Sequence, residues 1–415
     1  MITLRNGLNT LSSISQSPSC PILKESVTVE PLAIPLTRLS DEEIEIQEIV
    51  KRLANEKIRP LVKQMDETSK LDKTIIDSLF ENGLMSVNIE NRFDGTGSTF
   101  FSLMLVIEQL AKVDPAVSAF VGIHSTLVVQ TLNAFGSEEQ KSKYLPLLAK
   151  DTVGSFCLSE PNAGSDAFSM KTMAVKDGDY YVINGSKQWI TNAKEADVFV
   201  VFANVNPEAG YKGITCFIVE RNTPGLTVAK AEDKLGIRCS STCPVIFDSV
   251  RVPTSAVVGH IGQGYKYAMH TMNIGRIGIG AQMLGLAEGC FEEAVKYTFD
   301  RKQFGRRIFD FQAMQHQISQ IATRIESAKL LVYNAARLRD AGLPFTKEAA
   351  MAKYYAAEVA THTTSKAVEW LGGVGFTRDF PIEKYYRDCK IGAIYEGTSN
   401  IQLNTIAKLI DREFN

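Results

Sequence analysis

The chain has 415 residues, of which 45% are hydrophobic and 22% are charged, and its formal net charge is −2. This composition excludes a mainly disordered chain and offers no basic surface for nucleic acid, while the length indicates two or three domains. The seven cysteines contain no Cys-x-x-Cys pair, and Cys239 and Cys243, which come closest to a ligand pair, lack a second pair. We therefore expect reduced thiols, no metal site, and a small molecule or another protein as the partner.

The N-terminal 24 residues contain no acidic residue, several Ser and Thr, and the basic residues Arg5 and Lys24. This composition fits an organellar transit peptide, and a disordered N-terminal tail explains it equally well. We assign residues 1–37 to a leader or flexible arm.

The segment that follows has the periodicity of helices. Ser40 and Glu43 form the S-x-x-E pattern of a capping box, and apolar residues follow at helical spacing. The run 115–137 has no acidic residue, Lys or Arg, but it contains His124 and several hydroxyl and amide side chains, which predicts a buried helix rather than a membrane span. Residues 38–151 are therefore predicted to form a helical domain.

From residue 152 the pattern changes to short β-rich segments separated by Gly, Pro, Asn and Asp, which predicts a β domain of barrel or sandwich type over 152–266. No proline occurs between Pro253 and Pro344, and residues 267–415 are predicted to form a helical bundle. The longest helical patterns in this part are 276–303, 309–341 and 346–370. The predicted fold class is α+β and multidomain.

Several local motifs have both a functional and a structural explanation, and neighbouring residues alone favour the structural one. The glycine clusters at 259–264 and 372–375 lack the strand-to-helix context of a dinucleotide fingerprint, so loops explain them. The basic segment 301–317 is either a charged helix end or a phosphate site. Trp189 is either a core residue or a platform for a cofactor. Glu396, in AIYEGTSN, is either a solvated turn residue or a catalytic base.

Seven segments in chain order resemble the flavin-dependent acyl-CoA dehydrogenases, from about residue 38 to the C-terminus. They are FCLSEPNAGSD, KQWITNA, YKGIT, DKLGIRCSST, RKQFGRRIFDFQ, EWLGGVGFTRDFP and IYEGTSNIQ. Each segment alone is weak evidence for the family, whereas seven segments in the same order are strong evidence. Within the family the chain is most similar to the short/branched-chain branch. The resemblance implies a C-terminal four-helix bundle, FAD as the cofactor, and a homotetramer in the mitochondrial matrix.

The resemblance also implies a reaction, the oxidation of a short straight or 2-methyl-branched acyl-CoA to its 2,3-enoyl-CoA in fatty acid and isoleucine breakdown. Glu396 would remove the α-proton while the β hydrogen leaves as hydride to the flavin, and electrons would pass to electron-transferring flavoprotein. A carboxylate of ordinary pKa is too weak a base for this step unless burial raises its pKa and the substrate carbonyl is hydrogen-bonded.

Further residues are assigned to the cofactor and the substrate by the resemblance. The implied cofactor residues are Phe156, Leu158, Ser159, Ser165, Trp189, Ile190, Thr191, Arg301, Gln312, Glu369, Trp370, Leu371, Gly372, Gly373, Thr398, Ser399 and Asn400. Of these, Arg301, Gln312 and residues 369–373 would reach the FAD of a neighbouring subunit. The implied substrate residues are Ser165, Tyr211, Tyr265, Asn273, Ile274, Gly275 and Arg276.

The substrate segment departs from close relatives at one position. Where they read Asn-Glu-Gly-Arg, this chain reads Asn-Ile-Gly-Arg, with Ile274 in place of the acid. A branch of the family carries its base immediately before this arginine. Residue 275 is glycine here, so the resemblance favours Glu396 as the base.

Two other functions remain open on the sequence. An acyl-CoA oxidase shares the base and the flavin but passes electrons to oxygen, and such enzymes usually carry a further C-terminal domain, whereas this chain ends soon after Leu403. A non-catalytic paralogue would bind acyl-CoA or act as a scaffold, and it would need no base at the flavin. Retention of Glu396, Thr191 and Arg301 favours the dehydrogenase.

Overall fold

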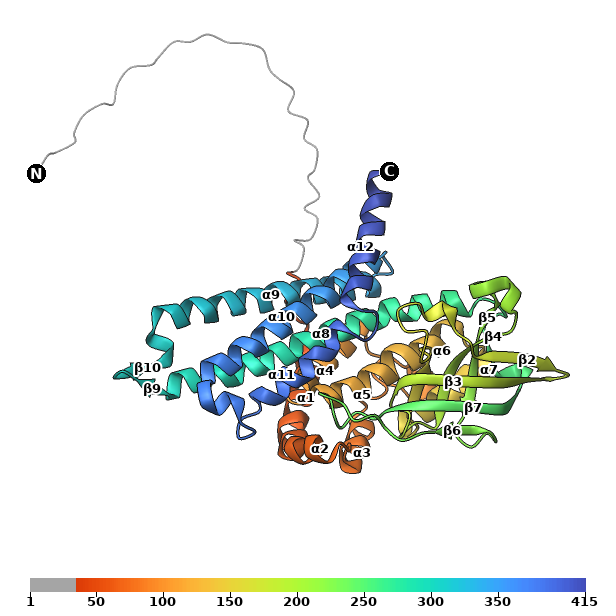
Figure 1. Ribbon diagram of the computed structural model, residues 1–415, viewed down its shortest axis with the longest axis horizontal. Coiled ribbons are helices and arrows are strands. Elements are labelled where there is room, and N and C mark those ends of the chain that lie inside the picture. The colour runs from red at the N-terminus through yellow and green to blue at the C-terminus, as the bar shows by residue number, and fades with distance from the viewer. Residues whose placement is uncertain (1–34) are drawn as a thin grey trace, which may run out of the picture. The chain divides into compact units, whose positions relative to one another are not determined.

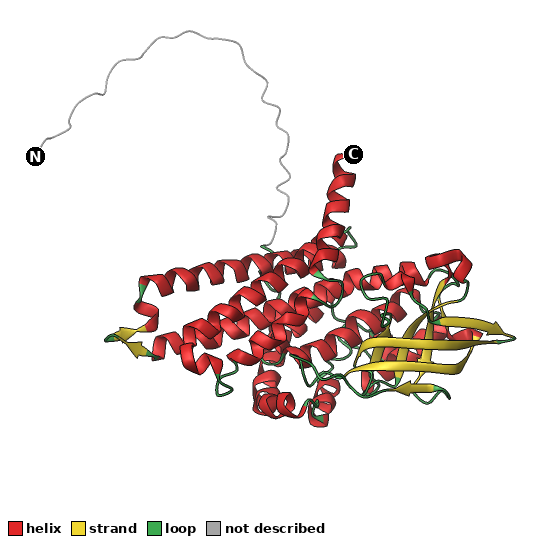
Figure 2. Cartoon of the chain, viewed as in Figure 1, coloured by secondary structure: helices red, strands yellow, loops and turns green. Residues whose placement is uncertain are grey.

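The structure, a computed structural model, describes residues 35–415. The transit-peptide prediction concerns residues outside this range. Figures 1 and 2 show a largely helical body with a sheet at one end, and the chain passes through helices, then strands, then helices. The predicted α+β fold class is confirmed.

The helices before the sheet are amphipathic or wholly apolar segments that build the first part of the core. They are α1 (Asp41–Leu53), α2 (Val62–Thr68), α3 (Lys73–Glu81), α4 (Phe100–Ala111), α5 (Pro115–Ile123), α6 (Gln130–Phe135) and α7 (Glu138–Lys150). The predicted capping box is present at the start of α1. Ser40 Oγ accepts from the Glu43 N–H at 3.3 Å, and Glu43 Oε2 accepts from the Ser40 N–H at 2.9 Å.

The segment Pro115–Phe135 lies in the centre of the molecule. It comprises α5, a π-helical turn at His124–Val129, and α6. Among the described residues this segment alone is long and apolar enough to cross a membrane, and 94% of its apolar window is buried inside the fold. It packs against α4 and against the long helix that follows the sheet. The segment is therefore a core helix, as the sequence predicts.

A single sheet contains β1 to β8 in the order β6-β7-β3-β2-β4-β5-β8, with β1 parallel to β4. The strands are β1 (Gly154–Cys157), β2 (Met173–Asp177), β3 (Tyr180–Thr191), β4 (Val198–Asn204), β5 (Ile214–Glu220), β6 (Leu226–Val228), β7 (Thr242–Pro253) and β8 (Val257–Val258). Strand β4 is buried on both faces. Phe199 and Val201 face the main core, while Val200 and Phe202 face a second core shared with α6 and α7. This double burial anchors the sheet to the helices.

The pairing of β3 with β7 is irregular near the C-terminal end of β3. The register shifts between Lys187 and Ile190, and Trp189 in this stretch has a φ of 64°. A bulge of this kind bends the strand and turns a side chain in a new direction. The Trp189 side chain is 59% exposed, whereas Ile190 is buried.

The C-terminal part is a bundle of long helices. Its elements are α8 (Gly264–Asp300), the hairpin strands β9 (Lys302–Gln303) and β10 (Arg306–Arg307), α9 (Gln312–Asp340), α10 (Thr346–Leu371), α11 (Ile382–Asp388) and α12 (Ser399–Phe414). Helix α10 packs against both α8 and α9, and α12 packs against α10. The bundle therefore brings residues from α8, α10 and the segment before α12 close together.

Helix α8 begins earlier than the predicted start at residue 276. The stretch missing from the prediction, 264–275, begins and ends with glycine, and Gly264 and Gly275 lower its helix propensity. Glycines further along the helix permit close packing, since a Cβ on Gly285 would lie 2.1 Å from the carbonyl oxygen of Glu108 on α4. Packing against α4 thus explains the glycine at 285, in the part of the helix that the sequence predicts.

Candidate active site

Glu396 lies in the short turn between the helical segment Cys389–Ala393 and α12. Its backbone has a φ of 53°, and Gly397 beside it has a φ of 85°. A left-handed conformation is uncommon for a residue with a side chain and persists when neighbouring contacts fix it. The turn therefore requires support from the surrounding helices.

Buried side chains from α10 and α12 supply this support. Gln402 Nε2 donates to the carbonyl oxygens of Glu396 at 3.1 Å and of Gly397 at 2.9 Å. Lys353 Nζ, from α10, donates to the Gly397 carbonyl at 2.7 Å. On the other side of the base, the Tyr395 hydroxyl donates to Gln282 Oε1 on α8. Three helices thus fix the backbone on both sides of Glu396.

The carboxylate of Glu396 is held away from water. As a whole residue Glu396 is partly exposed, but its Oε2 atom is buried and has no hydrogen-bond partner among the described residues. Burial raises the pKa of this carboxyl to about 7, and the nearby charges of Arg276 and Lys353 oppose that rise. Oε2 lies 2.9 Å from where a Cβ on Gly275 would be. A free lone pair and a pKa near neutrality suit a general base.

In the predicted substrate segment on α8, Gly275 and Arg276 lie near this carboxylate. Arg276 is buried, donates to Asn273 Oδ1 at 2.8 Å, and leaves its Nε without a partner among the described residues. Burial lowers the pKa of Arg276, and the charge of Glu396 opposes this. Ile274 points the other way and is only 1% exposed in the main core. Its side chain therefore has no surface on which to contact a ligand.

The residues predicted to face a flavin lie at the adjacent ends of β1 and β3. The Gln188 N–H donates to the Ser159 carbonyl at 2.9 Å, and Ser155 Oγ donates to the Thr191 carbonyl at 2.6 Å. The Ser159 and Thr191 segments are therefore neighbours. The exposed ring of Trp189 projects beside them, which is the environment of a platform for a planar group.

Phe156, Leu158 and Ile190 are buried in the same region, so only their backbone groups are available to a ligand. A buried ion pair between Lys187 and Glu160 supports this backbone. Lys187 Nζ contacts Glu160 Oε1 at 2.9 Å and donates to the Leu158 carbonyl at 3.0 Å.

Two predicted substrate residues meet at the start of α8. The rings of Tyr211 and Tyr265 are 4.9 Å apart between centroids, and the Phe168 ring lies 6.4 Å from that of Tyr265. Tyr211 and Ser165 are exposed. The three rings form an aromatic cluster, of which Tyr265 lies on the helix that also carries Gly275, while Tyr211 and Phe168 come from segments of the sheet region.

The remaining predicted cofactor residues occupy the opposite end of the bundle. Arg301 directly follows α8, Gln312 begins α9, and residues 369–373 end α10. Figure 1 shows β9 and β10, which lie between α8 and α9, at the end of the molecule opposite the sheet. About 39 Å of helix separates Gly275 from Arg301 at 1.5 Å per residue. Within one chain the structure does not bring this group together with Glu396 and Trp189.

The predicted residues Thr398, Ser399 and Asn400 directly follow the base at the start of α12. Thr398 is the N-cap and its hydroxyl accepts from the Ile401 N–H at 3.3 Å. Ser399 Oγ is buried without a partner among the described residues. This hydroxyl is available to a ligand that covers the turn.

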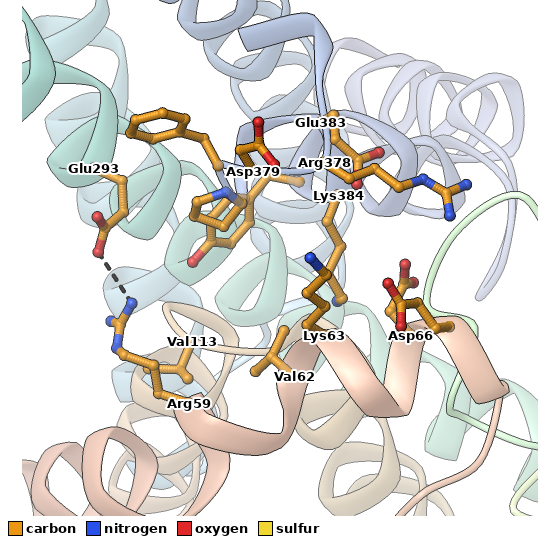
Figure 3. A pocket seen from close by; sticks show the side chains of 14 residues that line it. Arg59, Val62, Lys63, Asp66, Val113, Glu293, Arg378, Asp379, Glu383 and Lys384 are labelled. Atoms are coloured by element: carbon orange, nitrogen blue, oxygen red, sulfur yellow. Dashed lines mark hydrogen bonds and ion pairs between the residues drawn. The ribbon is translucent and has the colours of Figure 1, made fainter. Parts of the chain in front are cut away.

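A separate pocket of about 290 Å³ lies between α2 and the segment 378–385 (Figure 3). Its lining contains no residue of the groups described above. Arg59 forms an ion pair with Glu293 at 3.0 Å across the pocket, and Asp66 pairs with Arg387 at 2.8 Å. The pocket lies between helices and contains none of the candidate site residues, so it is not part of the candidate site.

Sequence reasoning missed the residues that support the site, namely Lys353, Gln402, Gln282 and Lys187. Lys353 does carry a local signal, because it is the one charged residue in the apolar run AAMAKYYAA. A lysine on a face of buried alanines indicates a specific partner, but the partner itself is visible only in the fold.

Comparisons with known proteins agree with this arrangement. Models of the acyl-CoA dehydrogenase N-terminal, middle and C-terminal domains match residues 40–152, 155–250 and 262–410. The chain is 57% identical to the mitochondrial short/branched chain specific acyl-CoA dehydrogenase of Rattus norvegicus, over 92% of this chain and 88% of that protein.

Two solved structures are also similar to the chain. Butyryl-CoA dehydrogenase from Megasphaera elsdenii matches with a TM-score of 0.89 and 38% identity, covering 90% of this chain and 99% of that chain. A chain from structural work on the electron transferring flavoprotein of Acidaminococcus fermentans matches with a TM-score of 0.90 and 40% identity. The match covers 91% of this chain and 99% of that chain. The chain therefore belongs to the acyl-CoA dehydrogenase family.

Proposed function

We propose that the protein oxidises short straight or 2-methyl-branched acyl-CoA thioesters to their 2,3-enoyl-CoA products, with Glu396 as the base that removes the α-proton. The observation that carries the proposal is the Glu396 carboxylate, which is buried over Gly275, has a free Oε2 and has a pKa of about 7. The 57% identity to a short/branched chain specific relative supports the substrate class.

The geometry supports two contributions by the chain itself. A base whose pKa lies near the working pH combines a usable ionised fraction with sufficient basicity. The Glu396 N–H has no acceptor among the described residues, so it is free to donate to the thioester carbonyl as enolate character develops. A bound acyl chain would also exclude water from the carboxylate and strengthen both effects.

The residues around Trp189 fit a flavin. The exposed indole at the bulge of β3 and the hydroxyls of Ser159 and Thr191 suit a flat and polar ring system. The Ser399 hydroxyl at the start of α12, which has no partner among the described residues, offers a further polar contact. FAD would be held by these residues and by Thr398 and Asn400. When bound, FAD supplies the acceptor for the β hydrogen and its electron pair.

The assembly and electron acceptor are further parts of the proposal. Arg301, Gln312 and residues 369–373 lie too far along the bundle to reach the same flavin as Trp189, which supports their action on the FAD of a neighbouring subunit in a homotetramer. Electron-transferring flavoprotein would accept the electrons. The mitochondrial relative and the composition of residues 1–24 support a location in the mitochondrial matrix.

An anaerobic titration of the purified protein with butanoyl-, 2-methylbutanoyl-, isovaleryl- and octanoyl-CoA tests the proposal. Strong bleaching of the flavin absorbance by the first two, abolished in Glu396→Gln, is expected. Oxygen is then admitted to the reduced protein. Rapid reoxidation of the flavin by oxygen, in place of electron-transferring flavoprotein, would instead identify an oxidase. Flavin that no acyl-CoA bleaches, or a protein that binds no flavin, would contradict the dehydrogenase and favour a binding or scaffold role.

A further inference from the structure

Lys353 is a buried cation without a carboxylate in direct contact. Its side chain is fully buried on α10, among alanines at 349, 352 and 356. Among the described residues its ammonium group makes one hydrogen bond, to the Gly397 carbonyl at 2.7 Å, and no ion pair within 4.0 Å. Burying a charged group is costly when its hydrogen-bond partner is neutral, so a compensating interaction with an opposite charge is expected.

The compensating charge is that of Glu396. The charged groups that face the Glu396 carboxylate are Arg276 on α8 and Lys353 on α10. Burial lowers the pKa of Lys353 to about 8, while the charge of Glu396 raises it and that of Arg276 lowers it. The side chain from α12 that contacts the turn, Gln402, is neutral. Lys353 therefore remains largely protonated at neutral pH and acts on the carboxylate through space.

The position of this cation matters for a base. A lysine paired directly with the carboxylate would occupy the lone pair that must receive the proton. Lys353 instead binds the next peptide carbonyl, which leaves Glu396 Oε2 without a partner among the described residues. The positive charge thus favours the ionised carboxylate without blocking it.

We propose that Lys353 is a positioning residue for the base, fixing the left-handed turn at Glu396 and Gly397 and keeping the carboxylate ionised when substrate excludes water. The inference rests on the proposed function, because it gives Lys353 a role in the reaction that Glu396 performs. Gln402 shares the first task, since it binds the Gly397 carbonyl and also that of Glu396, but it cannot share the second because it is uncharged.

Substitutions at Lys353 separate the hydrogen bond from the charge. Met removes both, Gln retains a donor without the charge, and Arg retains both. The matched control is Lys347→Met at the start of the same helix, where the lysine is partly exposed and paired with Glu413. Thermal midpoints and FAD content would establish that each variant is folded and loaded.

The first measurement is the rate of flavin reduction by saturating butanoyl-CoA across pH. For Lys353→Met and Lys353→Gln we expect the acid limb of the profile to move up by about one pH unit, from about 7 to about 8, which lowers the rate at pH 7 about fivefold. Lys353→Gln should lose less of the maximum rate than Lys353→Met. Lys353→Arg and the Lys347→Met control should keep the wild-type limb. An unmoved acid limb in both neutral variants would overturn the inference.

A second measurement does not depend on turnover. A double-mutant cycle of Lys353→Met and Glu396→Gln is made on the thermal midpoint at about pH 7.5, between the two pKa values, where the wild-type carboxylate is mostly ionised and Lys353 is mostly protonated. Non-additive midpoints are expected, and additive ones would contradict the coupling. If wild-type flavin is reduced by no acyl-CoA, the proposed function fails, and this cycle alone decides whether Lys353 acts on Glu396.

Discussion

Glu396 Oε2 lies 2.9 Å from the position that a Cβ on Gly275 would occupy. The same Cβ would lie 2.8 Å from Leu127 Cδ2, so a side chain at residue 275 would force the ends of the Leu127 and Glu396 side chains to shift. The absence of a side chain at Gly275 on α8 therefore leaves the space that the Glu396 carboxylate occupies, although the two residues are far apart in the sequence.

The first prediction is that Gly275→Ala displaces the base without unfolding the protein. A shift of the base by a fraction of an ångström should lower the maximum rate of flavin reduction about 10- to 100-fold, with little change in FAD content. Gly278→Ala is the control, since its Cβ would meet Thr126 at 3.1 Å and would not touch Glu396. Equal losses in both variants would indicate a general packing defect rather than a displaced base.

The second prediction concerns pH. Burial raises the pKa of Glu396 to about 7, and only the ionised carboxylate can accept the α-proton. The value of kcat/KM should therefore fall as the pH drops through 7. It is measured with butanoyl-CoA between pH 5.5 and 8.5, using an acceptor whose own reduction is independent of pH. A profile that stays level down to pH 5.5 would mean that the free enzyme keeps its base ionised by contacts absent from this structure.

The order of the fold could be predicted from sequence because its signals are local. The capping box at Ser40 and Glu43, the change to short β-rich segments at residue 152 and the absence of proline between Pro253 and Pro344 each depend on neighbouring residues. The start of α8 could not be predicted in the same way. Gly264 and Gly275 oppose helix formation locally, and they are tolerated because they pack closely against Ile214 on β5 and against the Glu396 side chain.

In the candidate site, even less could be predicted from local sequence signals, and more depends on contacts between distant segments. Local residues favour a solvated turn for Glu396, and only the resemblance identified it as a base. Its buried Oε2, its left-handed backbone and its support by Lys353 and Gln402 arise from contacts between distant helices. The outward turn of Trp189 similarly depends on a register shift between β3 and β7, which no pattern within either strand reveals.

The third prediction uses the two tryptophans of the chain. Trp189 is 59% exposed at the proposed flavin face, whereas Trp370 is buried. Titrating flavin-free protein with FAD should quench the Trp189 emission. Trp189→Phe should retain FAD but lose most of the quenching, because the aromatic plane remains without the indole. Trp189→Ala should weaken FAD binding about 5- to 10-fold, corresponding to roughly 1 kcal/mol for one aromatic contact. Unchanged quenching in Trp189→Phe would mean that Trp370 alone reports the flavin, and it would contradict a flavin at Trp189.

The fourth prediction tests whether Arg301 serves a neighbouring subunit. Arg301 and Glu396 belong to the same chain, but Arg301 lies at the end of α8 remote from the base. Two inactive variants, Arg301→Ala and Glu396→Gln, are therefore co-expressed with different affinity tags and purified through both tags. If Arg301 acts across the interface, each mixed pair contains a site with a native Glu396 from one chain and a native Arg301 from the other. Activity should then rise well above that of either parent.

If Arg301 acts within its own chain, every site in the mixed assembly carries one defect. The measured activity would then not exceed the average of the two parents. Co-expression of Glu396→Gln with Gly275→Ala provides the control, because both substitutions alter the same part of one chain and no mixed site regains both native residues. Restored activity in the first mixture and none in the control would assign Arg301 to the partner's flavin, and it would explain why the structure separates the two groups of cofactor residues along the length of α8.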